Sequence, residues 1–251
     1  MANDATIRVL LTMGSRVAIL GIIALIAIRP ALAAYEVVTV TNGGTINGVV
    51  TLSAKAPAEA AIKVTKNQDY CGQTIPDPAY TVDAGGGLAN VIVYLKDIAR
   101  GKAAPSEPLA LFNTKCMFSP RAQGAMVNER VKISSDDMVL HNTHAQKAET
   151  NATIFNVALP FKGFSLTKPL PSMPMMIKVK CDAHEWMHAW IMELDHPYYA
   201  TTGADGHFTI KDVPAGIYTL AVWHELAGEQ TASVVVTADQ TTQSKITLAA
   251  K

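Results

Sequence analysis

The chain of 251 residues carries 21 Lys and Arg against 21 Asp and Glu, so its formal net charge is zero. Charges of both signs are interspersed along the chain, which excludes a nucleic-acid-binding protein of the usual basic kind. Val, Thr and other β-forming residues are plentiful, so the sequence predicts one large β domain or two small ones.

Residues 1–34 have the pattern of an export signal. Two arginines precede an apolar run from Val17 to Ile28, and the small-residue motif Ala-Leu-Ala follows at positions 31–33. The run is shorter than the ~20 residues that span a bilayer, and Arg29 and Pro30 interrupt it. We predict a cleaved signal peptide, a mature protein in a bacterial periplasm, and no stable membrane insertion after cleavage. The alternative is an uncleaved anchor.

The first part of the mature chain is predicted to consist of strands and turns. Val, Thr and Ile alternate from Tyr35 to Leu52 between Asn-Gly turns, which indicates a hairpin or two strands. Asn90 to Leu95 is apolar enough to be a strand buried on both faces. The three glycines at 85–87 indicate a turn, because no phosphate-binding pattern accompanies them. Lys96 to Pro108 is expected to be a connector.

Two later strand-like runs end in residues that bind metals. Met126 to Ile133 is followed by His141, and Met175 to Lys180 is followed by Cys181, His184 and Met187. Thiolate, imidazole and thioether form a soft ligand set that favours copper, and two histidines, one cysteine and a weak axial methionine are typical of blue copper sites. These four residues are our candidate ligands.

The arrangement resembles the cupredoxin family over roughly Leu109 to His196. A His-Asn pair precedes a distant Cys-x2-His-x2-Met loop, whose spacing is most similar to the short-loop amicyanin type. The resemblance implies a Greek-key β-sandwich that holds one type 1 copper ion. A paired-copper centre would need a second cysteine in the loop, but position 185 is Glu.

The resemblance also implies roles for the residues around the ligands. Asn142 is expected to tie the two ligand loops together through hydrogen bonds near the sulfur. The outer edge of His184 is expected to reach the surface within an apolar patch, beside Trp186 and Met187. A redox partner is expected to dock there through a small, transient interface.

A rival motif overlaps the same loop. Residues 184–188 read His-Glu-x-x-His, which on a helix holds zinc and supplies a glutamate base. The flanking residues read as strands, Ile191 occupies the position where the extended motif needs glycine, and zinc hydrolysis gives Cys181 no role. The zinc hydrolase is therefore the weaker hypothesis.

The tail has a different pattern. Residues 205–208 read Asp-Gly-His-Phe and residues 213–218 read Val-Pro-Ala-Gly-Ile-Tyr, which indicates a hairpin. This resembles the carboxypeptidase regulatory-like, transthyretin-type β-sandwich. We predict an all-β protein with a signal peptide (1–34), the first part of this sandwich (35–105), a cupredoxin-like copper domain (106–197) and the second part of the sandwich (198–251).

Three cysteines in an exported protein leave one unpaired. Because Cys181 belongs to the metal loop, Cys71 and Cys116 are expected to form a disulfide, and two buried free thiols are the alternative.

The favoured function is a periplasmic electron carrier rather than an enzyme. Its expected partner is a c-type cytochrome or a periplasmic dehydrogenase. A copper storage or interaction module without redox cycling is the alternative.

Overall fold

The computed structural model describes residues 34–53, 61–96 and 98–250. The predicted signal segment thus lies outside the described residues, except for its last position. Within the described part of the chain, no helix is both long and apolar enough to cross a bilayer. The described residues are almost entirely β, with one α-turn, α1 (Gln68–Cys71), and one 3-10 turn, η1 (Pro78–Tyr80), which confirms the all-β prediction.

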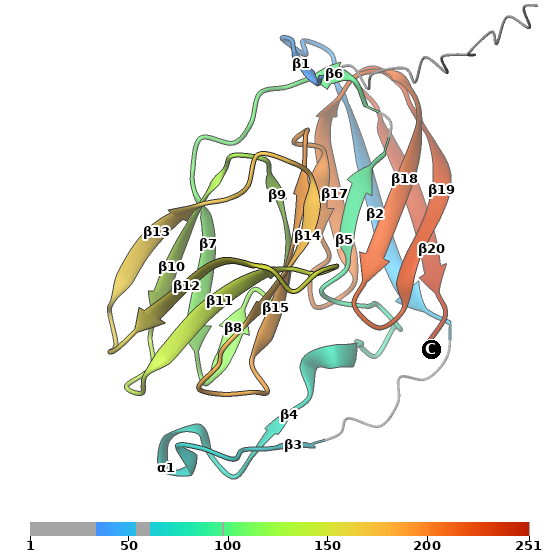
Figure 1. The fold of residues 1–251 in the computed structure, drawn as a ribbon. Coiled ribbons are helices and arrows are strands. Elements are labelled where there is room, and N and C mark those ends of the chain that lie inside the picture. The colour runs from blue at the N-terminus through green and yellow to red at the C-terminus, as the bar shows by residue number, and fades with distance from the viewer. Residues whose placement is uncertain (1–33, 54–60, 97, 251) are drawn as a thin grey trace, which may run out of the picture. The chain divides into compact units, whose positions relative to one another are not determined.

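The middle of the chain forms a sandwich of two sheets (Figure 1). One sheet has the strand order β13 (Ser165–Pro169), β10 (Arg130–Ser135), β7 (Leu109–Thr114), β8 (Met117–Ser119). The other has the order β12 (Thr153–Leu159), β11 (His141–Lys147), β14 (Met175–Lys180), β15 (His188–Leu194), β9 (Ala122–Met126). Each sheet contains one parallel pair, β10 with β7 and β15 with β9, so this sandwich is cupredoxin-like as predicted.

A second sandwich is built from segments that precede and follow the first sandwich in the sequence. Its sheets have the orders β16 (Tyr199–Thr201), β5 (Ile92–Leu95), β18 (Gly216–His224), β19 (Gly228–Val236) and β17 (His207–Val213), β2 (Gly44–Leu52), β20 (Thr241–Leu248). Strand β5 is buried at every position, as its sequence predicts. A short parallel pair, β1 (Glu36–Val37) and β6 (Arg100–Gly101), lies outside these sheets.

Each sandwich has its own core because strand residues alternate between inside and outside. On β14, for example, Ile177 and Val179 are fully buried while Lys178 and Lys180 point the other way. A third apolar cluster, which includes Ile92, Met192 and Ala221, joins the outer faces of β15 and β9 to those of β5 and β18. The two sandwiches therefore share an apolar contact.

Two details of the strand prediction are wrong. Met126 to Ile133 is not one strand: Asn128 adopts a left-handed φ of 62°, and β9 and β10 on either side belong to different sheets. The predicted tail hairpin does not form either, because β17 pairs with β2 whereas β18 pairs with β5 and β19. In both cases the turn joins strands of opposite sheets, β9 to β10 and β17 to β18. The apolar faces of the two joined strands therefore face the same core.

A small hairpin, which we call the 61–76 hairpin, packs on the first sandwich. It consists of β3 (Ala61–Lys63), α1 and β4 (Thr74–Pro76), and its Val64 and Ile75 lie in the core of that sandwich. The domain boundaries given above remain a prediction, but this hairpin is the only described segment before β7 that enters the first core.

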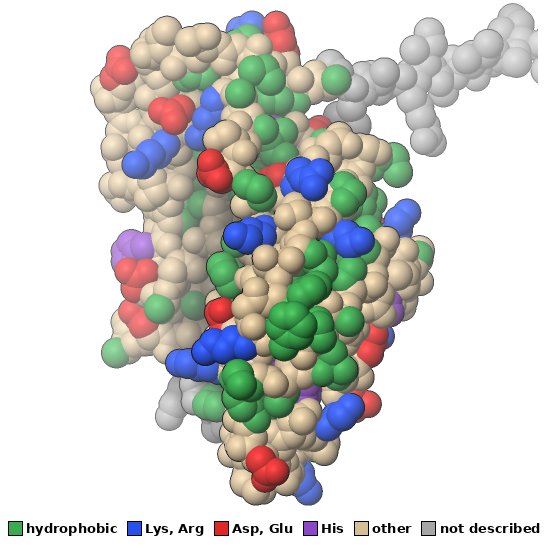
Figure 2. Space-filling model, turned by 90° about the vertical axis from the view of Figure 1, so that its left-hand side faces the viewer, with side chains coloured by type: hydrophobic (Ala, Val, Ile, Leu, Met, Phe, Trp, Pro, Cys, Tyr) green, Lys and Arg blue, Asp and Glu red, His purple; other side chains and the backbone are tan. Residues whose placement is uncertain are grey.

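Large hydrophobic side chains are also exposed. The side of the molecule at the left of Figure 1, around β13 and β10, shows such side chains between Lys and Arg (Figure 2). Among the described residues, Met138, Leu140 and Phe161 are 69%, 52% and 58% exposed. They lie on the two loops that lead into β11 and out of β12.

Candidate metal centre

The loop 181–187 joins β14 to β15 and is closed by its own backbone. The N–H of Cys181 donates to the carbonyl of Met187 at 3.1 Å, and the N–H of Met187 donates to the carbonyl of His184 at 2.9 Å. Cys181 is 1% exposed and is the free cysteine of the chain. The loop thus holds a buried thiol at its first residue.

Three candidate ligands meet at this thiol. The Sγ of Cys181 lies 3.9 Å from Nδ1 of His141, the first residue of β11, and 3.7 Å from Nδ1 of His184. The three donor atoms lie within 4.8 Å of one another, and all three residues are buried. Both imidazoles therefore present the same ring nitrogen to one sulfur.

A buried carboxylate fixes the orientation of His141. Its Nε2 lies 2.9 Å from Oδ2 of Asp137. Burial alone would lower the pKa of His141, but hydrogen bonds to Asp137 and Cys181 outweigh it and raise that pKa. Because Nε2 is bound to the carboxylate, Nδ1 is the ring nitrogen that faces Cys181 and is available to a metal, the arrangement found for many metal-binding histidines.

His184 is held from the opposite side by the 61–76 hairpin. Its Nε2 lies 2.9 Å from Oδ1 of Asn67, which has a left-handed φ of 55° immediately before α1. Burial, followed by the nearby charges of His141 and Lys66, lowers the pKa of His184 to about 4. The ring is thus neutral at neutral pH, with a free lone pair on Nδ1.

The expected exposure of His184 is wrong. The residue is 0% exposed, and Asn67 caps the ring edge that was expected to reach the surface. Trp186 and Met187, expected to flank a docking patch, are 8% and 0% exposed. Trp186 instead donates its indole N–H to the carbonyl of Cys116 at 3.0 Å, which ties it to the turn that carries the disulfide.

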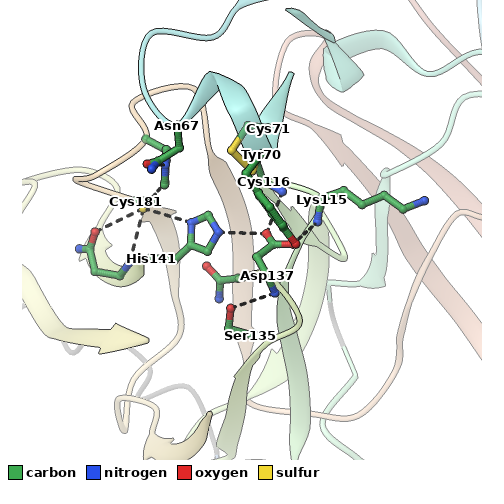
Figure 3. A network of polar contacts seen from close by, with 12 residues as sticks. Asn67, Tyr70, Cys71, Lys115, Cys116, Ser135, Asp137, His141 and Cys181 are labelled. Atoms are coloured by element: carbon green, nitrogen blue, oxygen red, sulfur yellow. Dashed lines mark hydrogen bonds and ion pairs between the residues drawn. A yellow bond between two sulfur atoms is a disulfide. The ribbon is translucent and has the colours of Figure 1, made fainter. Parts of the chain in front are cut away.

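The 61–76 hairpin is tied to the centre at two further points (Figure 3). The hydroxyl of Tyr70 donates to Asp137 at 3.2 Å, and Cys71 forms the predicted disulfide with Cys116. Asp137 also accepts the backbone N–H groups of Lys115 and Cys116 at 2.7 and 2.8 Å. One carboxylate therefore connects a candidate ligand, the hairpin and the disulfide turn.

Asn142 spans the two ligand loops. Its backbone N and its Oδ1 both lie 3.4 Å from Sγ of Cys181, and Oδ1 accepts the N–H of Asp182 at 2.7 Å. Burial alone would raise the pKa of Cys181, but hydrogen bonds from His141 and from the backbone N–H groups of Asn142 and the loop lower it. The surroundings thus stabilise a thiolate, the form that binds metals.

The His-Glu-x-x-His motif does not form a zinc-binding helix. Its first four residues lie in the loop and His188 begins β15, so the two histidines do not share a helical face. Nε2 of His188 instead contacts Arg121 and Glu225, at 2.6 and 3.1 Å. Cys116, Asp137 and His141 also lie close together, but Cys116 is bound in the disulfide and offers no thiolate.

Two residues of the centre were not singled out in the sequence. Asp137 stands four residues before His141, within an Asp-Asp pair, and that spacing was the available signal. Asn67 is distant in sequence, and its only link to the centre was the expected pairing of the nearby Cys71 with Cys116.

The family model of polysaccharide lyase family 4, domain II, matches residues 179–244, less than half of the chain. No curated protein matches the sequence. Solved structures with similarity to part of the chain include a purple cupredoxin from Nitrosopumilus maritimus, with 18% identity and a TM-score of 0.30 over 34% of this chain and 99% of that one. The copper-containing nitrite reductase NirK from Thermus scotoductus SA-01 has 15% identity and a TM-score of 0.32 over 40% of this chain and 25% of that one. A point mutant of amicyanin in its Cu(I) form has 12% identity and a TM-score of 0.30 over 36% of this chain and 86% of that one.

Proposed function

We propose that this protein is a type 1 copper electron carrier. His141, Cys181 and His184 would hold one copper ion, with the thioether of Met187 as a fourth, weak ligand. The observation that carries the proposal is that both histidines direct Nδ1 at the buried Cys181 sulfur while each Nε2 is bound elsewhere. One thiolate and two imidazoles form the donor set typical of blue copper sites.

The chain's own residues would keep this centre rigid and dry. Bound copper would supply one-electron chemistry by alternating between Cu(II) and Cu(I). Asp137 and Asn67 fix the two rings, Asn142 bonds near the sulfur, and the fully buried Met187 closes the loop. Groups that are already fixed have little to rearrange when the charge changes, which favours fast electron transfer. No general acid or base is needed, so we propose a carrier rather than an enzyme.

The setting of the carrier follows from the sequence. We infer an exported, periplasmic protein whose partner is a c-type cytochrome or a periplasmic dehydrogenase. The second sandwich combines strands that precede the first sandwich in the sequence with strands that follow it. This supports the proposal that a cupredoxin-like domain is inserted into a carboxypeptidase regulatory-like one.

One observation favours a second candidate, a copper storage or interaction module. The covered ring edge of His184 removes the short exit route that a carrier would use. A storage protein would hold Cu(I) and would not cycle between oxidation states.

Visible absorption spectra after Cu(II) addition to the mature protein test the proposal. We expect an intense thiolate-to-copper band that bleaches with ascorbate, returns on reoxidation and is absent from Cys181→Ser. A band that bleaches and does not return favours storage. A colourless protein that binds zinc instead contradicts both copper functions.

A further inference from the structure

His184 and Cys181 are both buried, but the two residues are connected to the surface in different ways. Asp182 follows the cysteine directly and its side chain is 41% exposed. Two covalently joined residues thus lead from the sulfur to solvent, whereas the path through His184 has to cross a hydrogen bond to the exposed Asn67, on a hairpin held by a disulfide.

A compact polar cluster surrounds Asp182 at the surface. Its carboxylate accepts the side-chain N–H groups of Asn142 and Asn156 at 2.8 and 3.0 Å, and His144 Nδ1 lies 3.0 Å away. Asn142 is also 3.4 Å from the cysteine sulfur, so the cluster offers a second route of one hydrogen bond.

The cluster lies on the outer face of the sheet formed by β12, β11 and β14. Strand alternation places Asn142, His144 and Gln146 of β11 on this face, opposite the buried His141, Thr143 and Ala145. The β14 residues paired with His144 and Gln146 are Lys180 and Lys178. We call this surface the Asp182 face; its members are Asn142, His144, Gln146, Asn156, Lys178, Lys180 and Asp182. Two lysines against one carboxylate give it a net positive charge.

We propose that the redox partner docks on the Asp182 face, and that electrons cross between Cys181 and the partner through Asp182 and Asn142. This inference rests on the proposed electron-carrier function. Each transfer moves one electron, oxidising the metal centre and reducing the partner by one, with no bond made or broken. The partner is a small redox protein with an acidic rim around its own cofactor, because the face is polar and positively charged.

Oxidation of the reduced, copper-loaded protein by ferricyanide, an anionic probe, tests the route. Lys178→Glu lowers the charge of the Asp182 face by two, and Lys66→Glu makes the same change beside the His184 side of the hairpin. At low ionic strength we expect Lys178→Glu to slow oxidation roughly three- to tenfold and Lys66→Glu to change it less than about twofold. Asn156→Lys, which adds a charge to the face, should accelerate it.

A measurement on the metal-free protein tests independently whether the 61–76 hairpin covers His184. Diethylpyrocarbonate modifies accessible neutral histidines, and His207, with a 67% exposed side chain, serves as the internal reference. We expect His184 to react at least about tenfold more slowly than His207, since it is completely buried. The slow reaction should become faster in Asn67→Ala.

The possible failures are distinguishable. If the absorption band does not bleach and return reversibly, the protein is not an electron carrier. If redox is reversible but Lys66→Glu strongly slows oxidation by ferricyanide and Lys178→Glu does not, the proposed docking face is wrong. Electrons would then pass through His184. Equal modification rates of His184 and His207 also overturn the proposed docking face, because the hairpin would then not close that edge.

Discussion

Nε2 of His141 lies 2.9 Å from Oδ2 of Asp137, and both side chains are almost completely buried. Burial alone would raise the pKa of Asp137, but hydrogen bonds from His141 and from the N–H groups of Cys116 and Lys115 outweigh it and lower that pKa. The carboxylate is therefore ionised and holds one ring nitrogen protonated. That leaves Nδ1 as the only nitrogen of His141 that is free to bind a metal.

Replacing Asp137 by Asn should weaken metal binding. The amide keeps the shape of the side chain but loses the charge that orients and polarises His141, so we expect the copper affinity to fall about 10- to 100-fold. Competitive titration against a chelator of known affinity measures the change. Asp136→Asn is the matched control, because Asp136 is the exposed neighbour and should leave the affinity unchanged. An equal loss in both variants would assign the effect to general electrostatics.

The disulfide should contribute strongly to stability. It joins residues 45 apart and fastens the 61–76 hairpin, so the chain-entropy model gives about 4 kcal/mol. The double variant Cys71→Ser, Cys116→Ser should lower the free energy of unfolding of the metal-free protein by roughly that amount in urea titrations. A loss below about 1 kcal/mol would mean that Val64 and Ile75 hold the hairpin without the covalent bond.

The grouping of His141, Cys181 and His184 could be predicted from sequence because residue type and spacing are local properties of two short segments. Cys181 and His184 share one loop, and His141 begins the strand after an acidic turn. The disulfide followed from the number of cysteines. None of these steps needed the position of one strand relative to another.

The cap on His184 could not be predicted because it is a tertiary contact between distant segments. Asn67 lies 117 residues before His184, and nothing in its own neighbourhood indicates a ring as its partner. Strand pairing failed for the same reason: the periodicity of β17 and β18 shows that each has an apolar face, but not that the two strands occupy opposite sheets.

The Arg121–Glu225 pair should stabilise the contact between the two sandwiches. Their side chains are 4% and 8% exposed, and Glu225 also accepts the indole N–H of Trp190 at 3.0 Å. Glu225→Gln leaves the arginine charge buried without its partner, so we expect a loss of about 3–5 kcal/mol in the free energy of unfolding. Glu229→Gln, which breaks the exposed pair with Lys96, should cost about 1 kcal/mol or less. If the two variants lose similar free energies of unfolding, burial does not make the Arg121–Glu225 pair more important than the exposed pair.

Glu193 should make the stability of the protein depend on pH. It is 1% exposed, neither carboxylate oxygen has a hydrogen-bond partner among the described residues, and burial raises its pKa from 4.5 to about 8. Below pH 4.5 the folded and unfolded states both hold the proton. Between about pH 4.5 and 8 only the folded state holds it, so the free energy of unfolding falls as the pH rises, and above that range the loss is constant.

Glu193→Gln should remove this dependence. Between pH 5 and 8 the wild-type protein should lose up to about 4 kcal/mol relative to the variant, because each unit of pKa shift corresponds to about 1.4 kcal/mol. Urea unfolding of the metal-free proteins at several pH values measures the two slopes, and comparing slopes avoids the separate cost of burying an amide. Glu149→Gln, in an exposed turn, should retain the wild-type slope. Parallel slopes for the wild type and Glu193→Gln would show that the Glu193 carboxyl ionises in the folded state with an ordinary pKa, and hence that water or a cation reaches it.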